Sequence, residues 1–178
     1  VTEAVDFNVG ELTLNRYVWK DINGKMTMGG KVYDFNGNAT GGNGNGNGIN
    51  PTTLVEGINA LLANKDKSGE RKPIVEDQTT TLKDPDVKAG EAVLINGLVY
   101  LEEGKTYTYK GQADDSGMII IGNGFSSQYV SWAGPTGGEH SKVFTVDKTG
   151  FYDFNLYVHN ESNIGNYDFK VTEENGTD

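Results

Sequence analysis

The sequence predicts an all-β fold, an antiparallel β-sandwich with a small helical insertion. The second half of the 178-residue chain contains many short segments rich in β-branched and aromatic residues, separated by glycine and asparagine turns. The chain has 25 glycines and 35% hydrophobic residues, which suits strands joined by turns. Its length fits one domain, residues 1–178, with a sizeable core.

The first predicted element is a strand within residues 11–20. This segment, ELTLNRYVWK, alternates apolar and polar residues over much of its length, as a half-buried strand does. Asn23-Gly24 follows and is a common hairpin signal. We therefore expect a return strand through Met26 and Met28.

Residues 34–50 have low complexity and predict a flexible loop. Their GGNGNG run is similar to a glycine-rich calcium-binding nonapeptide. However, Gly46 stands where that repeat requires Asp, and one repeat cannot stack into a β-roll. We assign no metal site to this loop.

One helix is predicted, at about 54–64. Thr53 and Glu56 form a capping box, in which each side chain satisfies a backbone N–H of the first turn. Together with the Gly/Asn-rich loop and a charged connection at 65–78, the helix belongs to a predicted insertion of about 34–90. Its apolar residues fall on one face and predict packing against a sheet: Leu54, Ile58, Leu61 and Leu62.

From residue 79 onward the pattern is nearly all β. Asn96-Gly97 and Asn123-Gly124 predict hairpin turns. Many short strands at this spacing favour a sandwich or a barrel. The predicted strands are 79–83, 92–96, 98–101, 105–112, 117–122, 126–132, 141–147, 151–159 and 166–172.

The composition limits the possible partners. A net charge of −10 argues against nucleic acid, and it fits both cation binding and a solubilising surface. The absence of cysteine excludes disulfides and thiolate zinc sites. An acidic, cysteine-free chain rich in Gly, Asn, Asp and Thr is typical of large secreted bacterial surface proteins.

No apolar stretch approaches the roughly 20 residues that span a membrane. No signal peptide opens the chain, so we expect a mature fragment or an excised module.

Asp114 and Asp115 are adjacent carboxylates between two predicted strands. Neighbouring side chains of a regular strand point to opposite faces, but in a loop two carboxylates can converge. Converged carboxylates repel each other unless a cation lies between them, and calcium accepts such hard oxygen ligands. The alternative interpretation is a solvated Asp-Asp-Ser-Gly turn.

The segment KTYTYKGQADDSGMIIIGNG, residues 105–124, resembles the signature of the protective-antigen-type carbohydrate-binding domain, the PA-fourteen family. Tyr107 and Tyr109 match its aromatic-alternating strand, and Ala113 with the Asp pair matches its core. The insertion of Ser116 before the glycine is a departure. GFYDFNLYVHNE, which begins at Gly150, resembles the family's later strand, so the resemblance covers about 104–172.

In the lectin branch of this family the Asp-Asp peptide is cis, and the resemblance implies the same for Asp114–Asp115. It further implies a calcium ion held by these two side chains, the Asn160 side chain, and the carbonyls of Ser162 and Ile164, with Gly165 following. Vicinal sugar hydroxyls would complete the coordination shell. Flocculins carry an aromatic residue where Ile164 stands, so the sugar-facing surface must differ.

Two interpretations of the surrounding residues stay open. Asn160 is also explained by a polar turn, or by a glycosylation sequon with Glu161 and Ser162. Trp132 either stacks on a pyranose or belongs to the core, and a strand tryptophan is more often core. The loop 134–139 is a candidate specificity rim. The predicted sugar-contacting residues are Asp114, Asp115, Asn160, Gln128, Trp132 and Asn163.

The sequence does not indicate an enzyme. His140 and His159 are the only histidines and belong to no catalytic zinc motif, and we expect His159 at the surface of a strand end. Glu102-Glu103 predicts a turn rather than a glycosidase pair.

The favoured function is a calcium-dependent lectin module of a bacterial surface adhesin, extracellular and monomeric within a larger chain, which binds cell-surface glycans in adhesion or biofilms. The alternatives are a calcium-rigidified structural or protein-binding module, and a domain of a glycoside hydrolase. The sequence does not identify the sugar.

Overall fold

The computed structural model describes residues 13–20, 25–28, 31–34, 51–66, 72–122, 124–132, 137–161 and 163–173. The Asn23-Gly24 turn and all but the first residue of the predicted loop 34–50 lie outside these residues. Ser162, a predicted carbonyl ligand, lies outside them as well.

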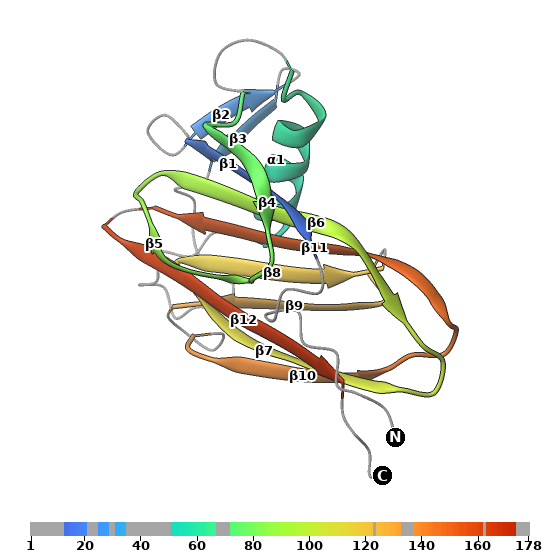
Figure 1. Cartoon of the computed structure of the whole chain (residues 1–178). Coiled ribbons are helices and arrows are strands. Elements are labelled where there is room, and N and C mark those ends of the chain that lie inside the picture. Colours follow the sequence, from blue (N-terminus) through green and yellow to red (C-terminus); the bar gives the residue numbers. More distant parts are fainter. Residues whose placement is uncertain are drawn as a thin grey trace.

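Two antiparallel sheets face each other and confirm the predicted β-sandwich (Figure 1). The six-stranded sheet has the order β4 (Val75–Thr79), β1 (Leu14–Lys20), β6 (Glu91–Leu101), β11 (Gly150–Asn160), β8 (Ser116–Ile121) and β9 (Ser126–Ser131). The four-stranded sheet has the order β10 (His140–Thr145), β7 (Thr106–Asp114), β12 (Gly165–Glu173) and β5 (Lys83–Val87). A separate pair joins β2 (Lys25–Met28) and β3 (Lys31–Asp34).

The main core fills the space between the sheets. Along each strand alternate residues point inward, so the buried apolar side chains recur with a period of two. The four-stranded sheet contributes the aromatic rings of Tyr107, Tyr109 and Phe169, and the six-stranded sheet contributes mostly aliphatic residues and Phe154. Non-polar burial of this kind is the main driving force for holding the two layers together.

Helix α1 (Pro51–Ala63) covers part of the outer face of the six-stranded sheet, beside β2 and β3 (Figure 1). Leu54, Ile58 and Leu61 are buried there, as predicted, and Leu62 is partly buried. The helix starts at Pro51, so Thr53 lies inside it and the predicted capping box is wrong. The fixed φ of proline suits the first helical turn, where its missing N–H would have no partner.

The predicted hairpin at Asn96-Gly97 is also wrong, because β6 runs straight through it. Asn96 is paired with Asn15 of β1 on one side and with Asn155 of β11 on the other. These long-range ladders outweigh the local turn preference of Asn-Gly. Strands β8 and β9 form an antiparallel hairpin, as predicted, although Asn123 of its turn lies outside the described residues.

The insertion predicted at about 34–90 is only partly separate from the sandwich. Strands β4 and β5 lie within it, and each adds an edge strand to one of the two sheets. Strand β2, expected to return alongside β1, pairs instead with β3. Within the described residues, no helix is long and apolar enough to cross a membrane.

Candidate cation site and its surroundings

Three connections between the two sheets meet at one end of the sandwich. They follow β5, β7 and β11, and each carries the chain from one sheet to the other. The strand register brings them together, because Asn166 lies opposite Asp114 and His159 lies opposite Ser116. The Asp pair and the loop after β11 are therefore neighbours, although about 45 residues separate them in the chain.

The Asp114–Asp115 peptide bond is cis, as the resemblance implies. Asp115 is only 3% exposed, so the interpretation as a solvated turn is wrong for this residue. Its backbone N–H donates to the His159 carbonyl (3.1 Å), and its own carbonyl accepts from the Trp132 N–H (3.0 Å). Its carboxylate accepts a hydrogen bond from the Glu161 backbone N–H. These contacts fix Asp115 between two loops.

The environment of Asp115 disfavours its negative charge. Burial, together with the neighbouring Asp114, raises the pKa of its carboxyl to about 7, against the opposing effect of the hydrogen bond from the Glu161 N–H. A buried carboxylate beside a second carboxylate either keeps a proton or gains a cation. A cation bound at this position would therefore stabilise the charged form of the two carboxylates.

Asn160 supplies a second unsatisfied group. Its side chain is fully buried, and Nδ2 donates to the carbonyls of Val87 (2.8 Å) and Asn163 (2.9 Å). These two acceptors fix the orientation of the amide, because a flipped group would set Oδ1 against two carbonyl oxygens. Oδ1 is buried and has no hydrogen-bond partner among the residues that the structure describes. A buried acceptor of this kind costs about 1–3 kcal/mol unless something satisfies it.

The burial of Asn160 also excludes two of its alternative interpretations. A fully buried amide is not a solvated turn residue. Nor can it accept a glycan in the folded protein, so the apparent sequon has no role there.

Gly165 shows how close the oxygen atoms of the two loops come. A Cβ added at this position would lie 2.2 Å from the Asp114 carbonyl oxygen and 2.9 Å from Asn160 Oδ1. Only a glycine permits both oxygens to lie against this backbone. The Asp114 carbonyl oxygen and Asn160 Oδ1 thus converge beside Gly165.

This set of donors fits a hard cation. Two carboxylates and a neutral amide oxygen are the ligands that calcium prefers, and their combined charge of −2 balances a divalent ion. No group of three or more His, Cys, Asp and Glu side chains that could hold a metal occurs in the described part of the chain. The candidate site therefore depends on amide and carbonyl oxygens in addition to the Asp pair.

The loop after β11 places the other predicted residues near the solvent. Asn163 has a left-handed backbone (φ 61°) and an exposed side chain. The Ile164 side chain is exposed as well. The roles predicted for the Ile164 carbonyl and the Asn163 side chain stay predictions.

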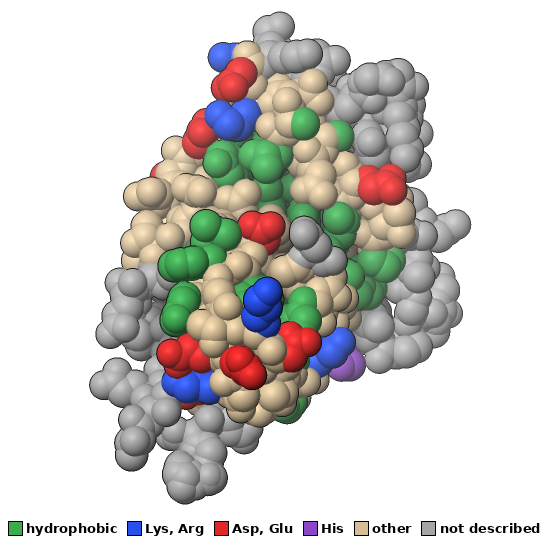
Figure 2. Space-filling view, turned by 90° about the vertical axis from the view of Figure 1, so that its right-hand side faces the viewer, with side chains coloured by type: hydrophobic (Ala, Val, Ile, Leu, Met, Phe, Trp, Pro, Cys, Tyr) green, Lys and Arg blue, Asp and Glu red, His purple; other side chains and the backbone are tan. Residues whose placement is uncertain are grey.

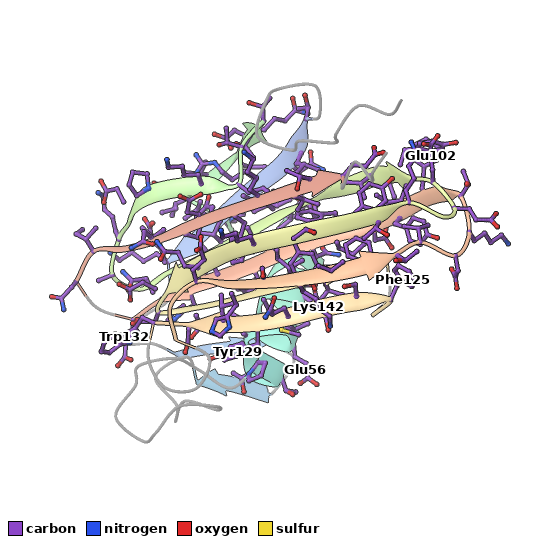
Figure 3. All side chains as sticks on the ribbon, turned by 90° about the horizontal axis from the view of Figure 1, so that it is seen from below. Glu56, Glu102, Phe125, Tyr129, Trp132 and Lys142 are labelled. Atoms are coloured by element: carbon purple, nitrogen blue, oxygen red, sulfur yellow. The ribbon has the colours of Figure 1, made fainter. Side chains whose placement is uncertain are left out.

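A cavity of about 160 Å³ lies next to Asp114. Trp132 lines it and is 46% exposed, so the interpretation of Trp132 as a core residue is wrong. The fully buried tryptophan is Trp19, under the helix. Figure 3 shows Trp132 at one end of the sandwich and Glu102 and Phe125 at the other. The lining residues are Gln112, Ala113, Asp114, Trp132, Gly138 and Asn166.

The sequence did not single out Gln112 and Asn166. Gln112 Nε2 donates to Asn166 Oδ1 (3.3 Å), so the pair forms a polar wall of the cavity. Both lie within two residues of a predicted ligand, Asp114 or Ile164, which is the signal that could have identified them. From the rim loop predicted at 134–139, Gly138 lines the cavity, while 134–136 lie outside the described residues.

Other predicted residues lie elsewhere. Gln128 is opposite Ile119 in the middle of β9, three residues and roughly 10 Å from Ser131 at the strand end. The structure does not bring it to the Asp pair. His159 is fully buried, so its predicted surface position is wrong. Glu102-Glu103 forms the turn between β6 and β7, as predicted, and Glu102 pairs with Lys105.

Comparison with solved structures supports the fold. The A domain of epithelial adhesin 6 from Candida glabrata, in complex with Galβ1-3GlcNAc, aligns with a TM-score of 0.51 and 12% identity, over 99% of this chain and 86% of that one. The A domain of epithelial adhesin 9, in complex with Galβ1-4GlcNAc, aligns with a TM-score of 0.52 and 10% identity, over 90% of this chain and 81% of that one. At sequence identities of 12% and 10%, these alignments show a similar fold only.

A third match covers far less of its partner. A β-glucosidase from Kluyveromyces marxianus in complex with glucose aligns over 61% of this chain but only 14% of the enzyme, with a TM-score of 0.43 and 14% identity. No protein-family model matches the sequence, and no curated protein sequence is significantly similar to it. The resemblance to the PA-fourteen family therefore stays a prediction.

Proposed function

We propose that this chain is a non-catalytic carbohydrate-binding module that holds a calcium ion with Asp114, Asp115 and Asn160. The observation that carries the proposal is the buried Oδ1 of Asn160. It has no hydrogen-bond partner in the described part of the chain and lies beside the same glycine as the Asp114 carbonyl. A bound cation would satisfy this oxygen and would neutralise the two carboxylates.

Calcium would supply open coordination positions for sugar hydroxyls. The ion takes roughly 6–8 oxygen ligands, more than these three side chains provide. The carbonyls of Ser162 and Ile164 are further ligands in this proposal, on the sequence resemblance. Two vicinal hydroxyls of a sugar would fill the remaining positions.

The cavity beside Asp114 supports a sugar as the ligand. It combines the half-exposed ring of Trp132 with the amides of Gln112 and Asn166. An aromatic face packs against the C–H groups of a pyranose, and amides exchange hydrogen bonds with its hydroxyls. The exposed Asn163 would contact the sugar from the other loop. The two adhesin domains that share this fold were solved with galactose-containing disaccharides, which is consistent with such a ligand.

The wider context is proposed on composition and resemblance. We expect an extracellular module of a bacterial surface adhesin, monomeric within a larger chain, that binds cell-surface glycans. The acidic composition, rich in Gly, Asn, Asp and Thr, supports this setting.

Isothermal titration with a panel of monosaccharides tests the proposal. Binding is expected with calcium and should disappear after chelation with EDTA. Asp115→Asn should lose binding while the protein stays folded, whereas Asp147→Ala, which removes an exposed carboxylate between β10 and β11, should bind as the wild type does. Sugar binding that survives complete chelation would contradict the mechanism.

A second function is favoured by the position of the site. Asn160 connects β11 to the end of β5 through Val87, and Asp115 connects to Glu161, so a cation there would rigidify three connections between the sheets. A structural or protein-binding module would use calcium only in this way. Thermal unfolding separates the two functions: calcium raises the midpoint in both, but an added sugar raises it further only in a lectin.

A further inference from the structure

The outer face of the six-stranded sheet is only half covered. Helix α1 buries Ala92, Leu94 and Tyr157 on this face. Farther along β6 and β11 the outward-facing side chains are exposed. Leu98 is 57% exposed, Tyr100 50% and Phe151 70%. Single exposed apolar residues are common, but neighbouring ones on one sheet face mark a contact surface.

The strand register groups these side chains with polar ones. Phe151 lies opposite Tyr100, with ring centroids 5.2 Å apart in an edge-to-face arrangement. Asp153 lies opposite Leu98 in the next outward-facing pair, and Asn155 lies opposite Asn96 in the one after it. Aromatic, mixed and amide pairs thus follow one another along β11.

Two cavities follow the same line. One, of about 320 Å³, is lined by Gly122, Phe125, Phe151, Tyr152 and Asp153. The other, of about 230 Å³, is lined by Asn96, Gly97, Leu98, Asp153, Phe154 and Asn155. They share Asp153 as a lining residue, and together they cover the stretch of β11 from Phe151 to Asn155, about 13 Å at the rise of a strand. We call this stretch the groove. Figure 2 looks onto this end of the molecule and shows hydrophobic side chains interrupted by separate acidic ones.

The chemistry of the groove selects the kind of ligand. Strands β6 and β11 pair with each other along the whole groove, so side chains of these two strands form its floor. No Lys or Arg is among the described residues that line the two cavities, and the chain carries a net charge of −10. Both facts disfavour an anionic ligand. Exposed rings beside two amides and one carboxylate suit a neutral molecule with apolar faces and many hydroxyls.

We propose that this groove binds a short neutral oligosaccharide without calcium. It is defined by Asn96, Leu98, Tyr100, Phe151, Asp153 and Asn155. The rings of Phe151 and Tyr100 pack against sugar faces, while Asp153 and Asn155 accept hydrogen bonds from hydroxyls. The site is separate from the Asp pair, since Phe125 beside it and Trp132 beside the Asp pair lie at opposite ends of the sandwich (Figure 3). The inference goes beyond the proposed function and does not depend on it.

An NMR titration of the ¹⁵N-labelled protein in EDTA tests the groove. The probes are cellopentaose, laminaripentaose, maltopentaose and mannopentaose. At least one is expected to shift the backbone amides of 96–100 and 151–155, in the wild type and in Asp115→Asn alike. Phe151→Ala should weaken this binding about tenfold, as expected for the loss of one stacking ring. Val143→Ala, which truncates an exposed apolar residue of the other sheet, should not change it.

Three results would overturn the inference. The first is the absence of shifts in these segments with all four probes. The second is a set of shifts that appears only with calcium and is lost in Asp115→Asn, because the sugar would then occupy the cation site. The third is a change in the same amides on raising the protein concentration without sugar, because the groove would then be an interface between copies. EDTA removes calcium from the cation site. A negative result for the groove in EDTA therefore says nothing about calcium-dependent sugar binding at Asp114, Asp115 and Asn160.

Discussion

Asn160 Nδ2 lies 2.8 Å from the carbonyl oxygen of Val87, so the last residue of β11 is tied to the last residue of β5. The second hydrogen of the same amide goes to the Asn163 carbonyl. Together these bonds leave Oδ1 beside Gly165, where the Asp114 carbonyl oxygen also lies. The amide thus both closes the loop and offers an oxygen ligand.

The substitution Asn160→Asp tests this arrangement. It replaces the amide nitrogen by an oxygen that would face two carbonyl oxygens and would add a third negative charge. In calcium-free protein we expect the free energy of unfolding to fall by about 1–3 kcal/mol, measured by chemical denaturation in EDTA. Asn163→Asp is the matched control, because the side chain of this residue is exposed and Asp tolerates a left-handed backbone. Equal stability of the two variants would contradict the assigned role of Asn160.

The raised pKa of Asp115 predicts a pH dependence in the absence of calcium. Burial holds this pKa at about 7 in the folded state, against 3.8 for an ordinary Asp. The folded state therefore binds the proton more tightly, and its contribution to stability is complete below the ordinary pKa and is lost as the pH rises to about 7. The unfolding midpoint in EDTA should therefore fall as the pH rises from about 4 to about 7.

Two comparisons isolate the contribution of Asp115. In Asp115→Asn the fall should be smaller, because the variant has no proton to lose at this position. Saturating calcium should also remove the fall, since an ion keeps the carboxylate charged in the folded state. A wild-type curve in EDTA that parallels the Asp115→Asn curve would show that Asp115 titrates normally.

Local patterns were sufficient to predict the sandwich and half of the candidate site. The alternation of Tyr107 and Tyr109 with polar residues identified β7, and Asp114–Asp115 stood between two strand patterns. Asn160 was found through the family resemblance. The buried position of Asp115 and the convergence at Gly165 confirm that the two loops lie together.

Non-local contacts explain what could not be predicted. Val87 takes part through a backbone carbonyl, which has no side-chain signature, and it lies 73 positions from Asn160. The Asn96-Gly97 pair is a turn by local preference and a strand only because β1 and β11 lie on both sides of it. Trp132 follows the last residue of β9 at the end of the sandwich, where the core no longer covers it.

The substitution Gly165→Ala should damage the cation site directly. Its Cβ would lie 2.2 Å from the Asp114 carbonyl oxygen, a backbone atom that cannot move aside easily. We expect the free energy of unfolding to fall by about 1–3 kcal/mol and the calcium-dependent rise of the melting midpoint to shrink or vanish. Gly150→Ala is the control, because nothing lies within 4 Å of a Cβ there. A calcium response that is the same in both variants would rule out a site beside Gly165.

The substitution Trp132→Ala should separate sugar binding from cation binding. The Trp132 ring lines the cavity beside Asp114. Its backbone N–H donates to the Asp115 carbonyl, and that bond survives in alanine. The calcium-dependent rise of the melting midpoint should therefore stay near the wild-type value, while the sugar affinity falls about tenfold through loss of ring stacking. Val143→Ala removes a similarly exposed apolar side chain from β10 and should change neither quantity. If Trp132→Ala kept full sugar affinity, the sugar would have to lie on the Asn163 side of the ion, away from the cavity. In that case Asn163→Ala would be the variant that loses binding.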